Sequence, residues 1–132
     1  MTTTGLSKFN KCIIRNRLVV QTPEEIVRQW LLEKMIHELG YPKGLISVEK
    51  KIGSRRFDIV VFTQEMNPIL LIECKANGLK EAENQAIGYN QMLKAPFICL
   101  ASSTEIKTFW SEQGQLKSVP FLPMYQQLKY VS

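Results

Sequence analysis

The clearest pattern of hydrophobic and polar positions lies between residues 22 and 40. Apolar side chains recur there at helical spacing along one stripe: Val27, Leu31, Leu32, Met35, Ile36 and Leu39. This stripe predicts an amphipathic helix. Thr22 is a suitable N-cap before Pro23, and Glu25 stands three residues after Thr22, as in a capping box. Gly40 and Pro42 predict the end of this helix.

Three short segments after the helix have the composition of strands. Residues 45–52 alternate in part, and Gly53 with Ser54 predicts a turn. Residues 57–62, FDIVVF, are β-branched and aromatic, and residues 69–76, ILLIECKA, read as a more buried strand. Three consecutive strands of this kind predict antiparallel pairing in a meander.

The second half of the chain predicts another helix and further strands. Residues 79–95 place four side chains on one helix face: Ala82, Ala86, Tyr89 and Leu93. Pro96 ends that pattern, and residues 97–102 and 105–110 read as strands. The tail from residue 118 reads as an irregular cover over the sheet or a short terminal helix. This order predicts an α/β fold in which a mixed sheet of four to five strands is flanked by helices.

Composition narrows the class of protein. The chain has 132 residues, 45% of them hydrophobic and 22% charged, which predicts one globular domain (1–132) and excludes a disordered chain. No apolar run reaches the roughly 18 residues of a membrane span, and the N-terminus lacks the apolar segment of a secretory signal. The 3 cysteines form no metal-ligand spacing, so we expect reduced thiols and a cytoplasmic protein. The net charge of +5 suits a polyanionic partner.

Three ionisable residues stand inside apolar strand segments: Asp58, Glu73 and Lys75. A charged group in such a segment is costly unless it is paired or bound to a metal. In a hairpin of the two strands Asp58 comes beside Glu73, and two carboxylates form a hard oxygen site suited to Mg²⁺. Lys75 projects from the same face as Glu73, where it would orient an attacking water and offset charge on a phosphate. The alternative is a Glu–Lys pair on a solvent-facing strand edge.

The ordered set of motifs resembles the PD-(D/E)XK nuclease superfamily. Asp58 is followed by Glu73-Cys74-Lys75, a helix that carries glutamates precedes them, and the element QAIGY follows at residues 85–89. More narrowly, about residues 18–110 resemble the N-terminal nuclease domain of type I restriction enzyme R subunits, which small stand-alone proteins also carry. Phe57 stands where the superfamily often has proline, a departure that this subfamily commonly shows. The resemblance implies a restriction-endonuclease-like fold with an αβββαβ core.

The resemblance also implies a role for each matching residue of the strand motif. Asp58 and Glu73 would hold Mg²⁺ or Mn²⁺, with the carbonyl of Cys74 as a further ligand. Lys75 would be the catalytic lysine. Whether one or two ions bind is left open.

Further matching residues lie on the two predicted helices. Gln85 and Tyr89 correspond to the QxxxY element of the R-subunit and recombination-nuclease branch, and their i,i+4 spacing puts them on one helix face. The resemblance implies that both are catalytic residues that reach the DNA or the active-site carboxylates. Glu25 would match the helix glutamate that approaches the metal, with Glu24 as the alternative. Without the resemblance, Glu25 is a capping residue, Gln85 a surface residue and Tyr89 a cover over the edge of the core.

Basic residues provide candidate contacts to nucleic acid: Arg28, Lys50, Lys51, Arg55 and Arg56. All except Arg28 flank the turn before Asp58, where they would contact the DNA backbone or remain solvated. Arg28 falls within the apolar stripe of the first helix, where it would pair with an active-site carboxylate, contact a phosphate, or bury its stem. His37 alone builds neither an HNH nor a zinc site, and we interpret it as structural.

These features predict a Mg²⁺-dependent DNA endonuclease, a phosphodiesterase in which a metal-activated water attacks phosphorus. Two alternatives stay open: a nucleic-acid-binding or assembly module of the same fold without turnover, and an RNA-directed or structure-specific nuclease such as a junction resolvase. The chain has no GxxxxGK[ST] loop, so we expect no ATP-driven translocase in it. It has no helix-turn-helix or zinc motif either, so sequence specificity would come from another subunit or from a homodimer, or the protein would have none. We expect DNA, and no membrane, as a partner.

Overall fold

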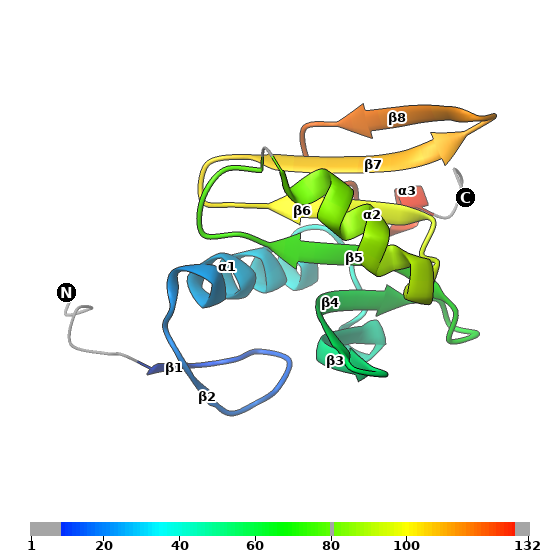
Figure 1. Ribbon diagram of the computed structural model, residues 1–132. Coiled ribbons are helices and arrows are strands. Elements are labelled where there is room, and N and C mark those ends of the chain that lie inside the picture. The colour runs from blue at the N-terminus through cyan, green and yellow to red at the C-terminus, as the bar shows by residue number, and fades with distance from the viewer. Residues whose placement is uncertain (1–8, 80, 129–132) are drawn as a thin grey trace.

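The computed structural model describes residues 9–79 and 81–128 of the chain (Figure 1). The helices are α1 (Pro23–His37), α2 (Ala82–Leu93) and α3 (Tyr125–Leu128), with a 3₁₀ helix η2 at Lys43–Leu45. The strands are β1 (Phe9–Lys11), β2 (Leu18–Val20), β3 (Ile46–Ile52), β4 (Arg55–Phe62), β5 (Pro68–Cys74), β6 (Phe97–Ala101), β7 (Ile106–Glu112) and β8 (Gln115–Val119). In these described ranges, no helix has the length and apolar character needed to cross a membrane.

The main sheet is mixed, with the strand order β3-β4-β5-β6-β7-β8, and β1 pairs with β2 in a separate hairpin. Every neighbouring pair in the main sheet is antiparallel except β5 and β6, which are parallel. Helix α2 lies across these two strands and makes the crossover between them, as a parallel pair requires (Figure 1). The α/β class, the meander of β3 to β5 and the crossover helix are confirmed.

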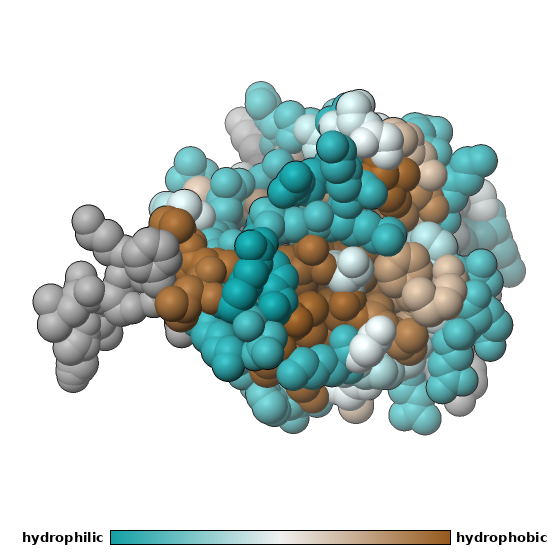
Figure 2. All heavy atoms as spheres, turned by 90° about the horizontal axis from the view of Figure 1, so that it is seen from below, coloured by the Kyte–Doolittle hydropathy of each residue, from teal (hydrophilic) through white to brown (hydrophobic). Residues whose placement is uncertain are grey.

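The main sheet has 6 strands where the sequence predicted four to five. Strand β8 was missed because residues 115–118 are all exposed, so no apolar alternation marks this edge strand. The β1–β2 hairpin was also missed. Strand β2 has only 3 residues, all apolar, and two of them point to solvent: Leu18 is 69% exposed and Val20 is 56% exposed. Figure 2 views the molecule from below and shows hydrophobic side chains in the middle of this face and again at its hairpin end. The hairpin thus leaves apolar surface uncovered.

Helix α1 begins as the sequence predicts. Thr22 is the N-cap, and its Oγ1 accepts a hydrogen bond of 3.1 Å from the backbone N–H of Glu25. The buried part of the predicted stripe comprises Val27, Leu31, Leu32 and Met35. The helix ends at His37, before Gly40, which adopts a φ of 74° that suits glycine. The capping box is half formed, because the Glu25 carboxylate turns away from Thr22 to bind Arg15.

The two long helices cover opposite faces of the sheet. The core beneath α1 includes Ile59, Val61, Leu70 and Ile72. The two clusters beneath α2 include Val60, Leu71, Ile98 and Leu100. Because successive strand residues point to opposite faces, these two sets lie on the two sides of the sheet. The start of β4 and the end of β5 are therefore reached by α1 from one face and by α2 from the other.

Candidate active site

Strands β4 and β5 bring Asp58 and Glu73 together. The antiparallel register pairs Ile59 with Ile72, which places Asp58 opposite Glu73 at the end of β5. The backbone N–H of Asp58 donates to Oε2 of Glu73 over 3.2 Å. The backbone N–H of Cys74 donates to Oδ2 of Asp58 over 2.7 Å. Each carboxylate is therefore held by a backbone donor from the neighbouring strand.

The electrostatics of this pair centre on Glu73, which is 6% exposed. Burial and, after it, the negative charge of Asp58 together raise the pKa of Glu73 to about 7. The hydrogen bond from the Asp58 N–H and the charges of Lys75 and Arg28 oppose this shift with smaller effects. The ionised pair is thus costly in the absence of additional positive charge, because two desolvated carboxylates repel each other.

The donor chemistry of the pair fits a hard divalent cation. Mg²⁺ binds proteins through one or two carboxylates and keeps several waters. In residues 9–79 and 81–128, His, Cys, Asp and Glu side chains form no group of three or more that could hold a metal ion. Glu24 is exposed in the first turn of α1. His37 is exposed on the same helix, with its Nε2 3.1 Å from Oε2 of Glu33. The candidate side-chain ligands are therefore the two carboxylates.

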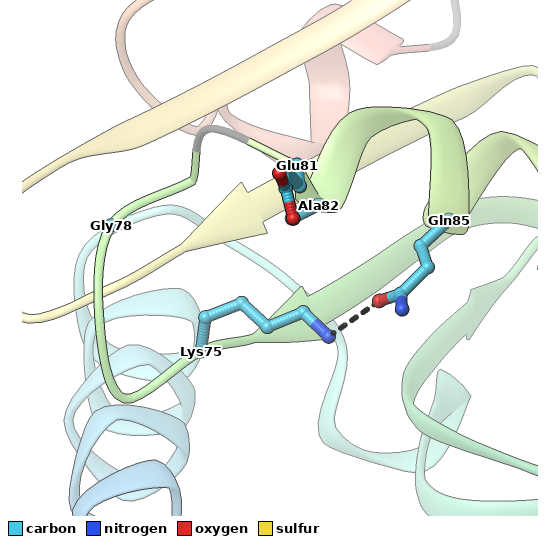
Figure 3. A pocket seen from close by; sticks show the side chains of 5 residues that line it. All are labelled: Lys75, Gly78, Glu81, Ala82 and Gln85. Atoms are coloured by element: carbon cyan, nitrogen blue, oxygen red, sulfur yellow. Dashed lines mark hydrogen bonds between the residues drawn. The ribbon is translucent and has the colours of Figure 1, made fainter.

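Lys75 directly follows β5 and points toward α2. Its Nζ donates to Oε1 of Gln85 over 3.3 Å (Figure 3). Its backbone N–H donates to the carbonyl of Ala101 over 2.8 Å, which fixes the backbone beside β6. An open pocket of about 320 Å³ lies here, lined by Lys75, Gly78, Glu81, Ala82 and Gln85. The structure thus joins the lysine of the strand motif to the glutamine of the helix motif.

A network of ion pairs lies on the other side of Asp58. Arg28 contacts Glu25 through Nη1, 2.7 Å from Oε1, and Asp58 through Nη2, 2.9 Å from Oδ1. Arg15, at the tip of the β1–β2 hairpin, contacts Oε2 of Glu25 over 2.6 Å and Oε2 of Glu49 over 2.9 Å. The network joins the hairpin, α1 and β3 to the start of β4.

Two interpretations from the sequence change here. The Arg28 side chain is 8% exposed and both terminal nitrogens are engaged with carboxylates, so it is not placed to contact nucleic acid. Of the alternatives for Arg28, the structure shows pairing with Asp58. Glu25 does not join the Asp58–Glu73 pair, because Arg28 lies between Glu25 and Asp58.

Glu25 is instead stabilised as an anion by its neighbours. Burial acts to raise its pKa, but hydrogen bonds from Gln29 and Arg15 and the charges of Arg28 and Arg15 outweigh it, so the pKa lies below its usual value. Gln29 donates to Oε2 over 2.6 Å, beside the Arg15 contact. Both Glu25 oxygens therefore already accept hydrogen bonds from neighbouring side chains.

Basic residues of the β3–β4 hairpin differ in where they point. Lys51, Arg55 and Arg56 are exposed. The Cζ atom of Arg55 lies 4.1 Å from the centroid of the Tyr89 ring on α2, a close cation–π contact. Lys50 is half-buried, with its Nζ 5.6 Å from the centroid of the Phe62 ring. The structure therefore brings Arg55 to the helix of the QxxxY element and does not bring Lys50 there.

Two network residues were missed by the sequence analysis. Glu49 lies opposite Asp58, between the ladder pair Val48–Ile59 and the next pair along β3. Its φ of 55° is in the left-handed region, which costs a non-glycine residue about 1–2 kcal/mol. A carboxylate inside the strand segment 45–52 was the available signal for Glu49. Arg15 lies in a segment without periodicity, and no local pattern identifies it.

Comparisons with known proteins agree with this architecture. The family model described as "Type I restriction enzyme R protein N terminus (HSDR_N)" matches residues 23–123. No curated protein matches the chain. A solved fragment, described as an HsdR subunit of a type I restriction enzyme from Vibrio vulnificus YJ016, superposes with a TM-score of 0.62 at 19% sequence identity. The match covers 82% of this chain and 24% of that chain, and it supports the restriction-endonuclease-like fold.

Proposed function

Because the chain belongs to the family of type I restriction enzyme R protein N-termini, we propose that it is a Mg²⁺-dependent nuclease domain that hydrolyses phosphodiester bonds in DNA. The observation that carries the proposal is the arrangement of Asp58, Glu73 and Lys75 around the end of β5. Two carboxylates hydrogen-bonded across a strand pair, with a lysine close enough to act on the pKa of one of them, meet the requirements of metal-assisted hydrolysis.

Asp58 and Glu73 are the residues that would hold Mg²⁺ or Mn²⁺, with the carbonyl of Cys74 as a third protein ligand. Such an ion supplies an activated water and stabilises negative charge on the phosphate. The protein's own contribution is to keep the carboxylates in place through the backbone donors of Cys74 and Asp58. Positioned groups of this kind do not need to reorganise when charge develops.

Lys75 would act on the scissile phosphate itself. Its side chain lines the open pocket, and its Nζ donates a hydrogen bond to Gln85 there. A cation there orients an attacking water and offsets the charge that develops on phosphate oxygens. Gln85 would hold the Lys75 ammonium in position and is a second candidate for contact with the substrate.

The β3–β4 hairpin and α2 would bind the DNA backbone. Lys51, Arg55 and Arg56 are exposed there, and the Arg55 guanidinium is held against the Tyr89 ring. Basic side chains of this kind neutralise phosphates without reading sequence. The chain spans about a quarter of the HsdR fragment that it resembles. We therefore propose that a partner subunit or a second copy of the chain supplies sequence specificity. We also propose that the protein acts in the cytoplasm.

The decisive experiment is a cleavage assay with the purified protein on single-stranded, duplex and branched DNA and on RNA, with Mg²⁺, Mn²⁺ and a chelator compared. We expect DNA cleavage that requires the ion and disappears in Glu73→Gln. Lys117→Gln is a matched surface control, because Lys117 lies on β8, separated from β5 by β6 and β7.

Each other result of this assay excludes the proposal. Cleavage that survives the chelator or Glu73→Gln would contradict the metal mechanism. Absence of cleavage on every substrate and with either ion would favour a binding or assembly module. Cleavage confined to RNA would contradict the proposed substrate.

A further inference from the structure

Arg28 occupies one side of a candidate metal ligand. Its Nη2 lies 2.9 Å from Oδ1 of Asp58, and the other carboxylate oxygen, Oδ2, accepts the backbone N–H of Cys74 over 2.7 Å. The guanidinium therefore provides Asp58 with the positive charge that a metal ion would provide. Glu73 has no comparable cationic partner among its described contacts. Its Oε2 accepts a hydrogen bond from the backbone N–H of Asp58, which carries no net charge.

The burial of Arg28 excludes a loosely held surface contact. Its side chain is 8% exposed, and its Nε is buried without a hydrogen-bond partner. A desolvated guanidinium stays in such a place because carboxylates compensate its charge, which here are Glu25 at 2.7 Å and Asp58 at 2.9 Å. A third carboxylate, Glu49, lies 3.8 Å from Nη1. Arg28 thus lies between the carboxylates of Glu25 and Asp58, with the carboxylate of Glu49 nearby.

We propose that Arg28 competes with a divalent cation for Asp58, and that it thereby lowers the affinity of the Asp58–Glu73 pair for the ion. The inference rests on the proposed function, because it takes the pair to be the metal site. An ion beside Asp58 has to share the carboxylate with the guanidinium or move it toward Glu25 and Glu49. Either event costs free energy, because the two cations repel each other at short range in a poorly solvated site. Arg28 is accordingly a positioning residue that sets how readily the site takes up its ion.

Arg15 provides a matched control for this proposal. Its side chain is 11% exposed, nearly as buried as that of Arg28, and it contacts Glu25 and Glu49 but makes no described contact with Asp58. Removing Arg15 therefore disturbs the same network without removing a charge that touches the candidate ligand. Glu25 keeps Arg28 and Gln29 in that variant, and it keeps Arg15 and Gln29 in a variant without Arg28.

The test is the binding of Mn²⁺ alone to DNA-free protein, measured by isothermal titration calorimetry. We expect Arg28→Met to bind Mn²⁺ about threefold to tenfold more tightly than the wild type, because a repelling charge is gone. Arg15→Met should change the dissociation constant by less than about twofold, because screening weakens a more distant charge. Arg28→Gln can still donate an N–H to Glu25 and replaces Arg28→Met in the test if that variant folds poorly. It should show the same increase in Mn²⁺ affinity. Arg28→Lys keeps the charge and should stay near the wild type.

The outcomes separate this inference from the proposed function. Mn²⁺ binding that is lost in Glu73→Gln but unchanged or weaker in Arg28→Met and Arg28→Gln would overturn the role of Arg28 and leave the nuclease proposal in place. Tighter binding in the Arg28 variants of a protein that never cleaves DNA would support the inference and exclude the nuclease. Absence of Mn²⁺ binding in the wild type and in every Arg28 variant would overturn the inference together with the metal site.

Discussion

The backbone N–H of Asp58 donates a hydrogen bond of 3.2 Å to Oε2 of Glu73, so the two candidate metal ligands are joined directly across β4 and β5. The bond is a consequence of strand register, since Ile59 pairs with Ile72. It holds the Glu73 carboxylate in a buried position, where its pKa is raised. We therefore expect the stability of the ion-free protein, its affinity for an ion and the pH dependence of its stability all to depend on this pair of residues.

We predict that the ion-free protein loses stability as the pH rises through neutrality. The pKa of Glu73 is raised from 4.5 to about 7, so between these values the folded protein binds more protons than the unfolded chain. The free energy of unfolding therefore falls with rising pH, by on the order of 3 kcal/mol for this group. Urea unfolding at about pH 5 and pH 8 should show the slope in the wild type and a smaller one in Glu73→Gln. An identical slope in both proteins would contradict the assignment.

We predict that Asp58→Ala lowers the free energy of unfolding of the ion-free protein, whereas Glu73→Gln does not. The alanine removes the acceptor for Arg28 and for the N–H of Cys74, at a cost of about 1–3 kcal/mol for buried groups left unpaired. Mg²⁺ should raise the melting temperature of the wild type, and neither variant should respond. At one hundred times its Kd an ion adds about 2.7 kcal/mol. A Mg²⁺ response retained in both variants would exclude the pair as the ion site.

We predict that Lys75→Met separates DNA binding from cleavage. The lysine would act mainly on charge that develops in the transition state, so its loss should lower the cleavage rate by about a hundredfold or more while DNA affinity changes little. Fluorescence anisotropy with labelled DNA and single-turnover cleavage measure the two effects. Lys117→Met, on β8, serves as the control for loss of one positive charge. A DNA affinity that falls as much as the cleavage rate would make Lys75 a binding residue.

We predict that Arg55 and Tyr89 act as one unit in DNA binding. Tyr89→Leu removes the ring against which the Arg55 guanidinium is packed at 4.1 Å, and Arg55→Ala removes the guanidinium itself. Each change should weaken DNA binding, and the double variant should be little worse than either single one, with a coupling of about 0.5–1 kcal/mol. Tyr89→Phe keeps the ring and should bind DNA like the wild type. Fully additive losses would show that the two residues act separately.

We predict that Thr22→Ala destabilises the protein by about 1 kcal/mol, because the N–H of Glu25 loses its cap. Thr22→Ser keeps the hydroxyl and should remain close to the wild type. Thermal and urea unfolding measure the difference. Since Glu25 stays bonded to Arg15, Arg28 and Gln29, Mn²⁺ affinity should be unchanged in Thr22→Ala. A marked change in ion affinity would mean that the first turn of α1 also controls the site.

Local regularity explains which parts of the fold were predictable. The stripe of α1 and its Thr22 cap are properties of neighbouring residues, and the structure confirms both. Strands β4 and β5 were visible because their buried positions are continuous and β-branched. The edge strand β8 and strand β2 of the hairpin offer too little local signal: residues 115–118 of β8 are exposed, and β2 has three residues of which only Val19 is buried.

By itself, the sequence determined the order of the elements from α1 to β7, the apolar strands β4 and β5, and the presence of Asp58 and Glu73 in them with Lys75 directly after, because these are local patterns of side-chain chemistry. Only the tertiary structure decided which charges meet. Arg28 contacts Asp58 from 30 positions away, and Arg15 contacts Glu49 from 34 positions away. Such contacts depend on how a helix and a hairpin dock on the sheet, and no periodicity records that docking. For this reason Arg28 changes from a candidate DNA contact to the partner of a candidate metal ligand.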